Sequence, residues 1–260
     1  MAEISLEIVD SVGWIVLNRP ARGNSLSASL VESLIDATQT CIDSEAVHTV
    51  VFVGAGRHFC TGFDLEGVDQ CTDADLLHRF VRIETLLDLV WRAPLRTVAL
   101  AQGRAIGAGA DLWVACDQRV LTVDSSLRFP GAGFGIVLGS RRLSLLVGAT
   151  RALQWVSEGS TISSALALET GLASQLLANE LDTARARDLT EATSLVTHIR
   201  SAWQPAVLAV DRLTYAALKQ ATQPVSQVSA DCDLAALVRS AARPGLQQRL
   251  VAYRDRHARR

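Results

Sequence analysis

The 260-residue sequence predicts an α/β core followed by a helical C-terminal segment. Two strand-like runs open the chain, and three further apolar runs alternate with segments of helical spacing up to about residue 125. From about residue 140 onward the spacing is almost entirely helical, and glycines or prolines separate the helices. We therefore expect the core at 1–180 and the helical segment at 181–260, with a hinge within 172–182.

The N-terminal elements follow from short-range patterns. The runs at 4–9 and 12–17 are apolar and separated by two residues, which is the pattern of a β-hairpin. Ser27 can cap a helix over 28–43, because a serine side chain accepts a hydrogen bond from an unpaired amide of the first turn. Apolar residues recur along 28–43 at helical spacing, which supports the same helix.

The middle of the chain is expected to alternate strands with one long helix. A buried strand is predicted at 49–53, where a glycine turn closes it. Helical spacing covers 75–92, and Pro94 ends that helix because the residue before a proline avoids the helical conformation. Further strands are predicted at 97–103 and 119–123, and the first of these leads directly into a glycine-rich stretch.

Composition and charge argue against several kinds of partner. The formal charge is −2 and the pI is near 6.2, so no overall field attracts nucleic acid or an anionic membrane. The five cysteines are widely spaced and match no zinc pattern, so we expect reduced thiols and no metal site. The first residues lack a targeting pattern, and no apolar run reaches the roughly 18 residues of a membrane span. A cytoplasmic protein is the resulting expectation.

The stretch GRAIGAGADLWVACD, residues 103–117, places one acid directly after a run of small residues. A helix that begins near Gly107 leaves its first amide N–H groups without carbonyl partners, and small side chains let a ligand approach them. With the positive end of the helix dipole, such amides can stabilise an oxyanion. Asp111 lies three residues after Ala108, on the same helix face. A close-packed helix start and a solvated acid are the alternative interpretations.

A similar corner occurs at 50–65, VVFVGAGRHFCTGFDL. A buried strand is followed by a glycine turn, after which Gly62 and Phe63 are expected to enter another helix. One amide N–H from each corner, directed at the same oxygen, would stabilise a thioester enolate or a tetrahedral intermediate. The presence of both corners therefore favours an oxyanion hole over a purely structural role.

Four phrases occur in a distinctive order and spacing: NRPARGNSL, GRHFCTGFDL, QGRAIGAGADLWVACD and GSTISSALALETGLASQLL. Over about residues 3–180 the chain resembles the crotonase family, the enoyl-CoA hydratase/isomerase superfamily. The resemblance implies a spiral core of repeated ββα turns, acyl-CoA substrates, and homotrimers or hexamers. It implies no metal or redox cofactor, since coenzyme A is part of the substrate. The helical segment would take part in oligomerisation and cover the acyl-CoA site.

The resemblance also assigns roles to single positions. The two oxyanion donors fall on the backbone N–H groups of Phe63 and Ala108, and Asp111 matches the first catalytic carboxylate. Asp111 would then act as the general acid/base of the reaction. The residues expected to contact coenzyme A are Arg22, Cys60, Gly62 and Lys219.

The sequence departs from the family at the second catalytic carboxylate. In SLRFPGAGFGIVLGSRRL, residues 126–143, the expected glutamate aligns with Gly133 or with Gly131. General acid–base help is worth roughly 10²–10⁴-fold per group, so a slower enoyl-CoA hydratase is our first expectation. Isomerisation, retro-aldol cleavage and decarboxylation need only one such group and are alternatives. A CoA-binding partner protein without catalysis is an alternative of a different class.

The same loop contains three arginines. Arg128, Arg141 and Arg142 could bind a carboxylate of the substrate, because a guanidinium can form two parallel hydrogen bonds with a carboxylate. The simpler alternative is that these arginines lie at the surface or at a subunit interface.

Overall fold

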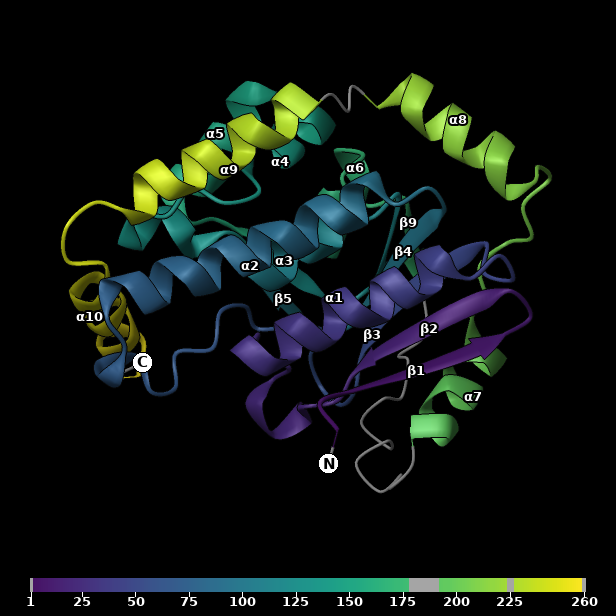
Figure 1. The fold of residues 1–260 in the computed structure, drawn as a ribbon, viewed down its shortest axis with the longest axis horizontal. Coiled ribbons are helices and arrows are strands. Elements are labelled where there is room, and N and C mark those ends of the chain that lie inside the picture. Colours follow the sequence, from purple (N-terminus) through teal and green to yellow (C-terminus); the bar gives the residue numbers. More distant parts are fainter. Residues whose placement is uncertain (1, 178–191, 224–226, 259–260) are drawn as a thin grey trace.

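The computed structural model describes residues 2–177, 192–223 and 227–258, and Figure 1 shows a sheet flanked by helices. The strands are β1 (Ile4–Val9), β2 (Val12–Leu17), β3 (Thr49–Gly54), β4 (Arg96–Ala101), β5 (Arg104–Ile106), β6 (Gln118–Thr122), β7 (Ser126–Arg128), β8 (Thr161–Ser163) and β9 (Gln175–Leu177). The helices are α1 (Ala28–Asp43), α2 (Asp73–Arg92), α3 (Ala108–Val114), α4 (Ser140–Val147), α5 (Ala149–Glu158), α6 (Ser164–Glu169), α7 (Ala192–Ala202), α8 (Arg212–Thr222), α9 (Gln227–Ala241) and α10 (Leu246–Ala258). Three 3-10 turns are η1 (Pro20–Arg22), η2 (Val68–Gln70) and η3 (Pro130–Phe134).

The described strands form two sheets. The main sheet has six strands in the order β1-β2-β3-β4-β6-β9, and the small sheet has the order β5-β7-β8. In the main sheet β1 and β2 are antiparallel and the other pairs are parallel. The predicted hairpin and the predicted first helix are confirmed, and Ser27 Oγ accepts the Leu30 N–H at 3.0 Å as the expected cap.

The ββα repeat expected for the core is confirmed. β4, β5 and α3 follow one another along the chain, and β6 and β7 then lead through η3 to α4. The preceding unit starts with β3 and ends with α2, and its second strand is reduced to a bridge between Cys60 and Ala105. Ala105 also pairs with Leu127 of β7. The turns that follow successive main-sheet strands are therefore stacked on one another.

Three expectations about secondary structure are wrong. No helix begins at Phe63, because this residue forms a β-bridge with Leu26 and only the short turn η2 follows. The strand predicted at 97–103 ends at Ala101. The prediction that the chain after residue 140 is almost entirely helical is wrong at two short segments, because β8 pairs with β7 and β9 joins the main sheet. Strands of three residues are too short to give a period in the sequence. The predicted boundary at residue 180 lies outside the described residues.

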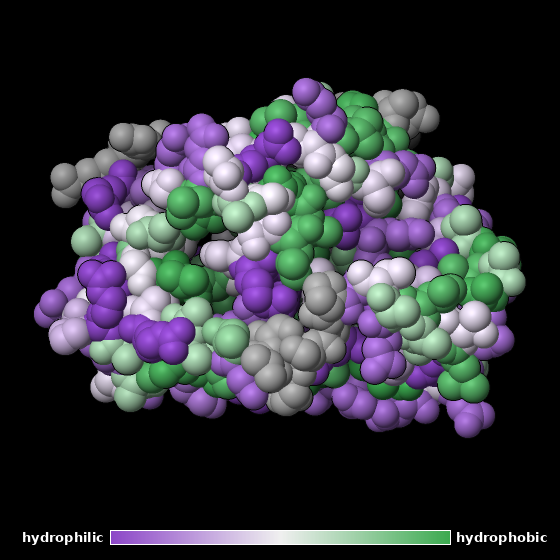
Figure 2. All heavy atoms as spheres, turned by 90° about the horizontal axis from the view of Figure 1, so that it is seen from above, coloured by the Kyte–Doolittle hydropathy of each residue, from purple (hydrophilic) through white to green (hydrophobic). Residues whose placement is uncertain are grey.

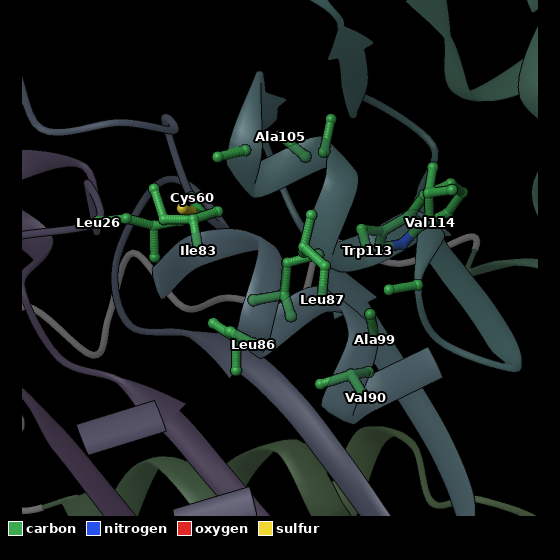
Figure 3. Packing of buried hydrophobic residues seen from close by; sticks show 14 of the residues in the cluster. Leu26, Cys60, Ile83, Leu86, Leu87, Val90, Ala99, Ala105, Trp113 and Val114 are labelled. Atoms are coloured by element: carbon green, nitrogen blue, oxygen red, sulfur yellow. The ribbon is translucent and has the colours of Figure 1, made fainter. Parts of the chain in front are cut away.

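Alternation along the strands divides the core between the two faces of the sheet. Ile15 and Leu17 of β2 belong to the cluster that includes α1 and α2, whereas Trp14 and Val16 belong to the cluster with α7. α2 supplies a row of apolar side chains to the first cluster (Figure 3). Figure 3 labels Ile83, Leu86, Leu87 and Val90 of α2 together with Leu26, Cys60, Ala99, Ala105, Trp113 and Val114.

The face over α5, α8 and α9 is mixed in character. Figure 2 shows small groups of hydrophobic side chains on it, separated by hydrophilic ones. Leu153 of α5 is 71% exposed and Leu213 of α8 is 83% exposed. Of the helices in the described ranges, none has both the length and the hydropathy that a membrane crossing requires.

Helix α10 packs against η2, η3 and α2. Asp73 of α2 accepts hydrogen bonds at 2.8–3.1 Å from three backbone N–H groups at the start of α10. Arg249 of α10 donates to the backbone oxygen of Phe134 in η3 at 2.8 Å. These contacts hold α10 against η3 and bring Tyr253 to the candidate site described below.

Candidate active site

A cavity of about 80 Å³ lies where the two glycine-rich corners meet, and we call it the central cavity. Five positions singled out from the sequence line it together: Gly62, Phe63, Ala108, Asp111 and Gly131. Its apolar wall includes Leu65, Phe80, Phe134, Ile136, Leu138 and Val156. The cavity therefore combines a few polar groups with a mainly apolar wall, as small-molecule sites commonly do.

Glycines allow the two corners to approach each other. Gly62 has a φ of +91°, and a Cβ on it would overlap the carbonyl oxygen of Ile106. The same Cβ would lie 3.5 Å from the amide nitrogen of Ala108. A Cβ on Gly109 would lie 2.5 Å from the carbonyl oxygen of Cys60. The run of small residues is thus explained by the close packing of one corner on the other.

Two backbone N–H groups remain available at this junction. The neighbours of Phe63 are used in pairing, because Gly62 O accepts the Leu26 N–H at 2.7 Å and Asp64 N donates to Leu26 O at 3.2 Å. Ala108 is the first residue of α3, so its N–H has no carbonyl partner within the helix. Neither the Phe63 N–H nor the Ala108 N–H donates to a protein acceptor in the described residues. Both residues line the central cavity.

Asp111 brings one acidic group to the same cavity. It lies in the first turn of α3, is 5% exposed, and packs against Gly139 so closely that a Cβ there would overlap its carboxylate. Burial raises the pKa of Asp111 well above its usual range; the negative charge of Glu84 adds to this effect and Arg142 opposes it. A carboxyl with a raised pKa keeps its proton to higher pH and can act as a proton donor.

The cavity contains no counterpart of a second catalytic carboxylate in its described lining. Asp111 is the one carboxylate among the residues that line it. Gly131 faces the cavity, and a Cβ there would lie 3.2 Å from the carbonyl oxygen of Ile136. Gly133 does not line it, and a Cβ there would meet nothing within 4 Å. Both candidate positions therefore leave Asp111 without an acidic partner in the cavity.

Two of the three loop arginines form ion pairs within the chain. This differs from both predictions made from the sequence, a site for a substrate carboxylate and a position at the surface or at a subunit interface. Arg142 is fully buried and donates to Glu84 of α2 at 2.7 Å. Arg141 binds Asp233 of α9 with two nitrogens, at 2.6–2.9 Å. Arg142 also lies 3.7 Å from Asp233, so the two arginines tie α4 to α2 and α9.

Of the residues expected to contact coenzyme A, Arg22, Cys60 and Gly62 lie close together around Thr61, whereas Lys219 lies apart. Arg22 of η1 is 46% exposed; its backbone oxygen accepts from Thr61 of the cavity wall at 3.5 Å, and its side chain pairs with Glu66 at 2.7 Å. The Cys60 thiol is buried outside the lining, and burial raises its pKa to about 12. The structure does not bring Lys219 to the cavity.

Lys219 lies instead at the opposite end of the main sheet. Its ammonium pairs with Asp117 at 2.9 Å, and the Asp117 N–H donates to Thr97 at 3.0 Å. Thr97 lies near the start of β4, whereas the cavity lies beyond the end of that strand. Within one chain, the Lys219 ammonium therefore pairs with Asp117 and does not reach the central cavity.

The aromatic wall of the cavity was not predicted from the sequence. Tyr253 of α10 lines it and packs on Phe134 of η3, with the ring centroids 4.9 Å apart. Phe80 of α2 stacks on Phe63 with centroids 4.4 Å apart. Local spacing identified Phe80 only as a position within a helix, and it contained no signal that relates residue 253 to residue 63.

The chain is similar to a large group of known proteins. The family model described as enoyl-CoA hydratase/isomerase matches residues 7–235. A probable enoyl-CoA hydratase (echA6) of Mycobacterium leprae is 35% identical over 179 residues, which is 66% of this chain and 70% of that protein. An ethylmalonyl-CoA decarboxylase of Xenopus laevis is 31% identical over 172 residues, which is 65% of this chain and 58% of that protein.

Solved structures agree with the fold. A crystal structure from Bordetella parapertussis, described as a candidate enoyl-CoA hydratase/isomerase, matches with a TM-score of 0.83 and 36% identity. The match covers 97% of this chain and 98% of that chain. An enoyl-CoA hydratase of Bacillus halodurans matches with a TM-score of 0.75 over 96% of this chain and all of that chain; at 21% identity this likeness concerns the fold alone.

Proposed function

Because the chain belongs to the enoyl-CoA hydratase/isomerase family, we propose that it processes acyl-CoA thioesters through an enolate bound in the central cavity. The backbone N–H groups of Phe63 and Ala108 bind the thioester oxygen, and Asp111 transfers the proton. The observation that carries the proposal is that one buried carboxyl lines the same cavity as two residues whose amides have no acceptor among the described residues. Coenzyme A enters as part of the substrate.

The amide pair supplies the electrostatic part of catalysis. Negative charge develops on the thioester oxygen when the enolate forms, and preorganised N–H donors stabilise it more strongly than they stabilise the ground state. The loss of one such donor typically raises the barrier by about 2.7–4 kcal/mol. The α3 N-terminus adds its positive dipole end at Ala108. In this proposal Asp111, one turn further along α3, protonates or deprotonates the α-carbon of the thioester.

We propose hydration of an enoyl-CoA as the first candidate reaction. It is supported by the family match and by relatives named as probable enoyl-CoA hydratases. Water adds at the β-carbon, and the α-carbon takes up a proton. With one carboxyl in the cavity, Asp111 both accepts the proton of the attacking water and delivers a proton to the α-carbon. We expect turnover to be slower than with two carboxylates, by roughly 10²–10⁴-fold.

Decarboxylation is the second candidate, and the single acidic group of the cavity favours it. Loss of CO₂ from a carboxylate on the α-carbon of the thioester breaks the bond between that carbon and the carboxylate, and the electron pair stays on the α-carbon as an enolate. That enolate then needs one proton, which the neutral form of Asp111 can donate. The apolar wall would weaken the solvation of the departing carboxylate. Some relatives are named ethylmalonyl-CoA decarboxylases.

The proposal is tested with purified protein and two substrate classes. Trans-2-enoyl-CoA thioesters are followed by loss of the conjugated enone absorbance, and malonyl-type thioesters by release of CO₂. Asp111→Asn should remove turnover of the substrate class that is active, whereas Asp36→Asn, a control on the exposed face of α1, should retain it. Equal turnover by wild type and Asp111→Asn would refute the role of Asp111. Tight acyl-CoA binding without turnover of either class would instead support a non-catalytic binding protein.

A further inference from the structure

A second cavity of about 310 Å³ adjoins the central cavity, and we call it the arginine cavity. The two cavities share three wall residues, Pro130, Val156 and Tyr253. The remaining described lining is mostly polar or charged and includes Arg128, Arg256, His257, Glu158, Ser157 and Gly133. The oxyanion donors line the central cavity alone. The shared wall is therefore the side of the central cavity that faces the arginines.

The two arginines of this cavity have no carboxylate partner in the described part of the chain. Arg128 Nε donates to the backbone oxygen of Gly159 at 2.9 Å, and no protein acceptor within the described residues takes its two terminal nitrogens. Arg256 Nε donates to the backbone oxygen of Ala252 at 3.1 Å. An arginine whose Nε is already held in place presents its terminal nitrogens as a ready donor pair.

One carboxylate also lines the arginine cavity. Glu158 Oε2 accepts from Ser160 at 3.2 Å and from Gln154 at 3.5 Å, and it lies beyond 4 Å from every arginine nitrogen that the structure describes. Two guanidinium groups and the His257 imidazole face this one carboxylate. The cavity therefore has an excess of positive charge and can take an anion.

Tyr253 lies between the two cavities. Its ring packs on Phe134 of the central cavity, while burial raises the pKa of its hydroxyl and the nearby charges of Arg128 and Arg256 oppose that rise. The backbone of Arg128 is also bonded to the corner that precedes α3, because its carbonyl oxygen accepts the Gly107 N–H at 2.8 Å. This hydrogen bond fixes the backbone of Arg128 relative to the start of α3, where the Ala108 N–H lies.

We propose that the arginine cavity binds a carboxylate at the far end of the acyl group, so that the preferred substrates are CoA thioesters of dicarboxylic acids. The proposal rests on the proposed function, because it takes the thioester to lie at Phe63 and Ala108. The phosphates of coenzyme A are a second source of the same anion chemistry. We favour the acyl carboxylate because Arg22, the site expected for those phosphates, lies on the Thr61 side of the central cavity, and Thr61 does not line the arginine cavity.

The test uses pairs of trans-2-enoyl-CoA thioesters of equal chain length, one ending in a methyl group and one in a carboxylate. The dissociation constant is measured by calorimetry and kcat/KM by enone absorbance, over a series of chain lengths. A hydrogen-bonded charged contact is worth about 1.5–3 kcal/mol, so we expect a preference of at least about 10-fold for the carboxylate at one or more lengths. If the protein preferred the methyl-ended thioester at every chain length, the proposal would be overturned.

Substitutions in the arginine cavity identify the side chain that binds the terminal carboxylate. Arg128→Ala and the milder Arg128→Gln should each remove most of the preference for the carboxylate, and Gly133→Glu should do so by adding a carboxylate to the cavity. Gly133 has no positive φ and no neighbour within 4 Å of a Cβ, so this third variant is expected to fold. Arg151→Ala, on the exposed face of α5, is the control and should keep the preference. If Arg128→Gln lowered the affinity for the methyl-ended and the carboxylate-ended thioester equally, the arginine would bind a coenzyme A phosphate instead.

The failure of this proposal can be told apart from failure of the proposed function. Selective binding of the carboxylate without turnover would refute the function and leave the assignment of the arginine cavity standing. Turnover that depends on Asp111 but shows no preference for the carboxylate would refute the arginine cavity alone. Asp111→Asn should abolish turnover while the binding preference persists.

Discussion

Glu84 of α2 and Arg142 of α4 form an ion pair in the interior of the protein, with contacts of 2.7 and 3.2 Å. Their side chains are 4% and 0% exposed. The two charges act in opposite directions on Asp111, because Glu84 raises the pKa of its carboxyl and Arg142 lowers it. The same pair therefore joins α2 to α4 and influences the pKa of Asp111, the proposed proton donor.

The first prediction concerns the stability supplied by this pair. Removal of Glu84 leaves the buried Arg142 with only the more distant carboxylates of Asp88 at 3.6 Å and Asp233 at 3.7 Å, so Glu84→Ala should lower the free energy of unfolding by up to about 3–5 kcal/mol. Glu32→Ala is the matched control, because Glu32 pairs with Arg82 where the side chains are 47% and 32% exposed. That surface pair should contribute at most about 1 kcal/mol. Urea unfolding of both variants measures the difference, and equal losses would contradict the prediction.

The second prediction concerns stability as a function of pH. Asp111 holds its proton more tightly in the folded chain than in the unfolded chain, whose carboxyl has its ordinary pKa. Its contribution to folding is full below the ordinary pKa and is lost as the pH rises through the raised pKa. Asp111→Asn stays neutral, so it should become progressively more stable than wild type above about pH 4. Urea unfolding at several pH values, with Asp36→Asn as control, would reveal a constant difference if the pKa were not raised.

The third prediction concerns activity as a function of pH. If the neutral carboxyl of Asp111 donates the proton, kcat should fall as the pH rises through its raised pKa. Glu84→Gln removes a charge that raises this pKa, so the fall should move to lower pH. Glu32→Gln should leave the profile in place. A Glu84→Gln profile that coincides with that of wild type would disprove the electrostatic link.

The fourth prediction concerns the oxyanion corner. Gly62→Ala introduces a methyl group that overlaps the Ile106 carbonyl and separates the two corners. We expect kcat/KM to fall by about 10²–10³-fold, the effect of one lost oxyanion donor. Gly171→Ala is the control, because Gly171 also has a positive φ, +74°, but a Cβ there meets nothing within 4 Å. Similar activity of the two variants would argue against the corner as the site.

The fifth prediction concerns assembly. We expect homotrimers or hexamers, the states that the family resemblance implies. Leu145 of α4, Leu153 of α5 and Leu168 of α6 are 45%, 71% and 44% exposed in the single chain, so each is a candidate for a contact between subunits. Leu153→Asp should reduce the mass measured by light scattering, and Gln39→Asp on α1 should not. A wild-type protein of monomeric mass would contradict the expectation.

Local patterns predicted the N-terminal elements well because the relevant interactions act within one turn or one strand pair. The cap at Ser27 bonds to Leu30, only three residues away. The prediction failed at Phe63, where pairing with Leu26 replaced the expected helix. Pairing between segments of this separation cannot be found from local spacing, and neither can a strand of three residues such as β5.

The sequence by itself determined the family, and it led us to propose Phe63 and Ala108 as the oxyanion amides, Asp111 as the acid, and Gly131 or Gly133 as the position of the absent glutamate. These features are contained in short contiguous phrases, because each proposed oxyanion donor is a backbone N–H group that follows a strand and a glycine along the chain. Only the tertiary structure decided the surroundings of these groups. The burial of Asp111 beside Glu84, the wall formed by Tyr253 and the arginine cavity all depend on packing between elements far apart in the chain.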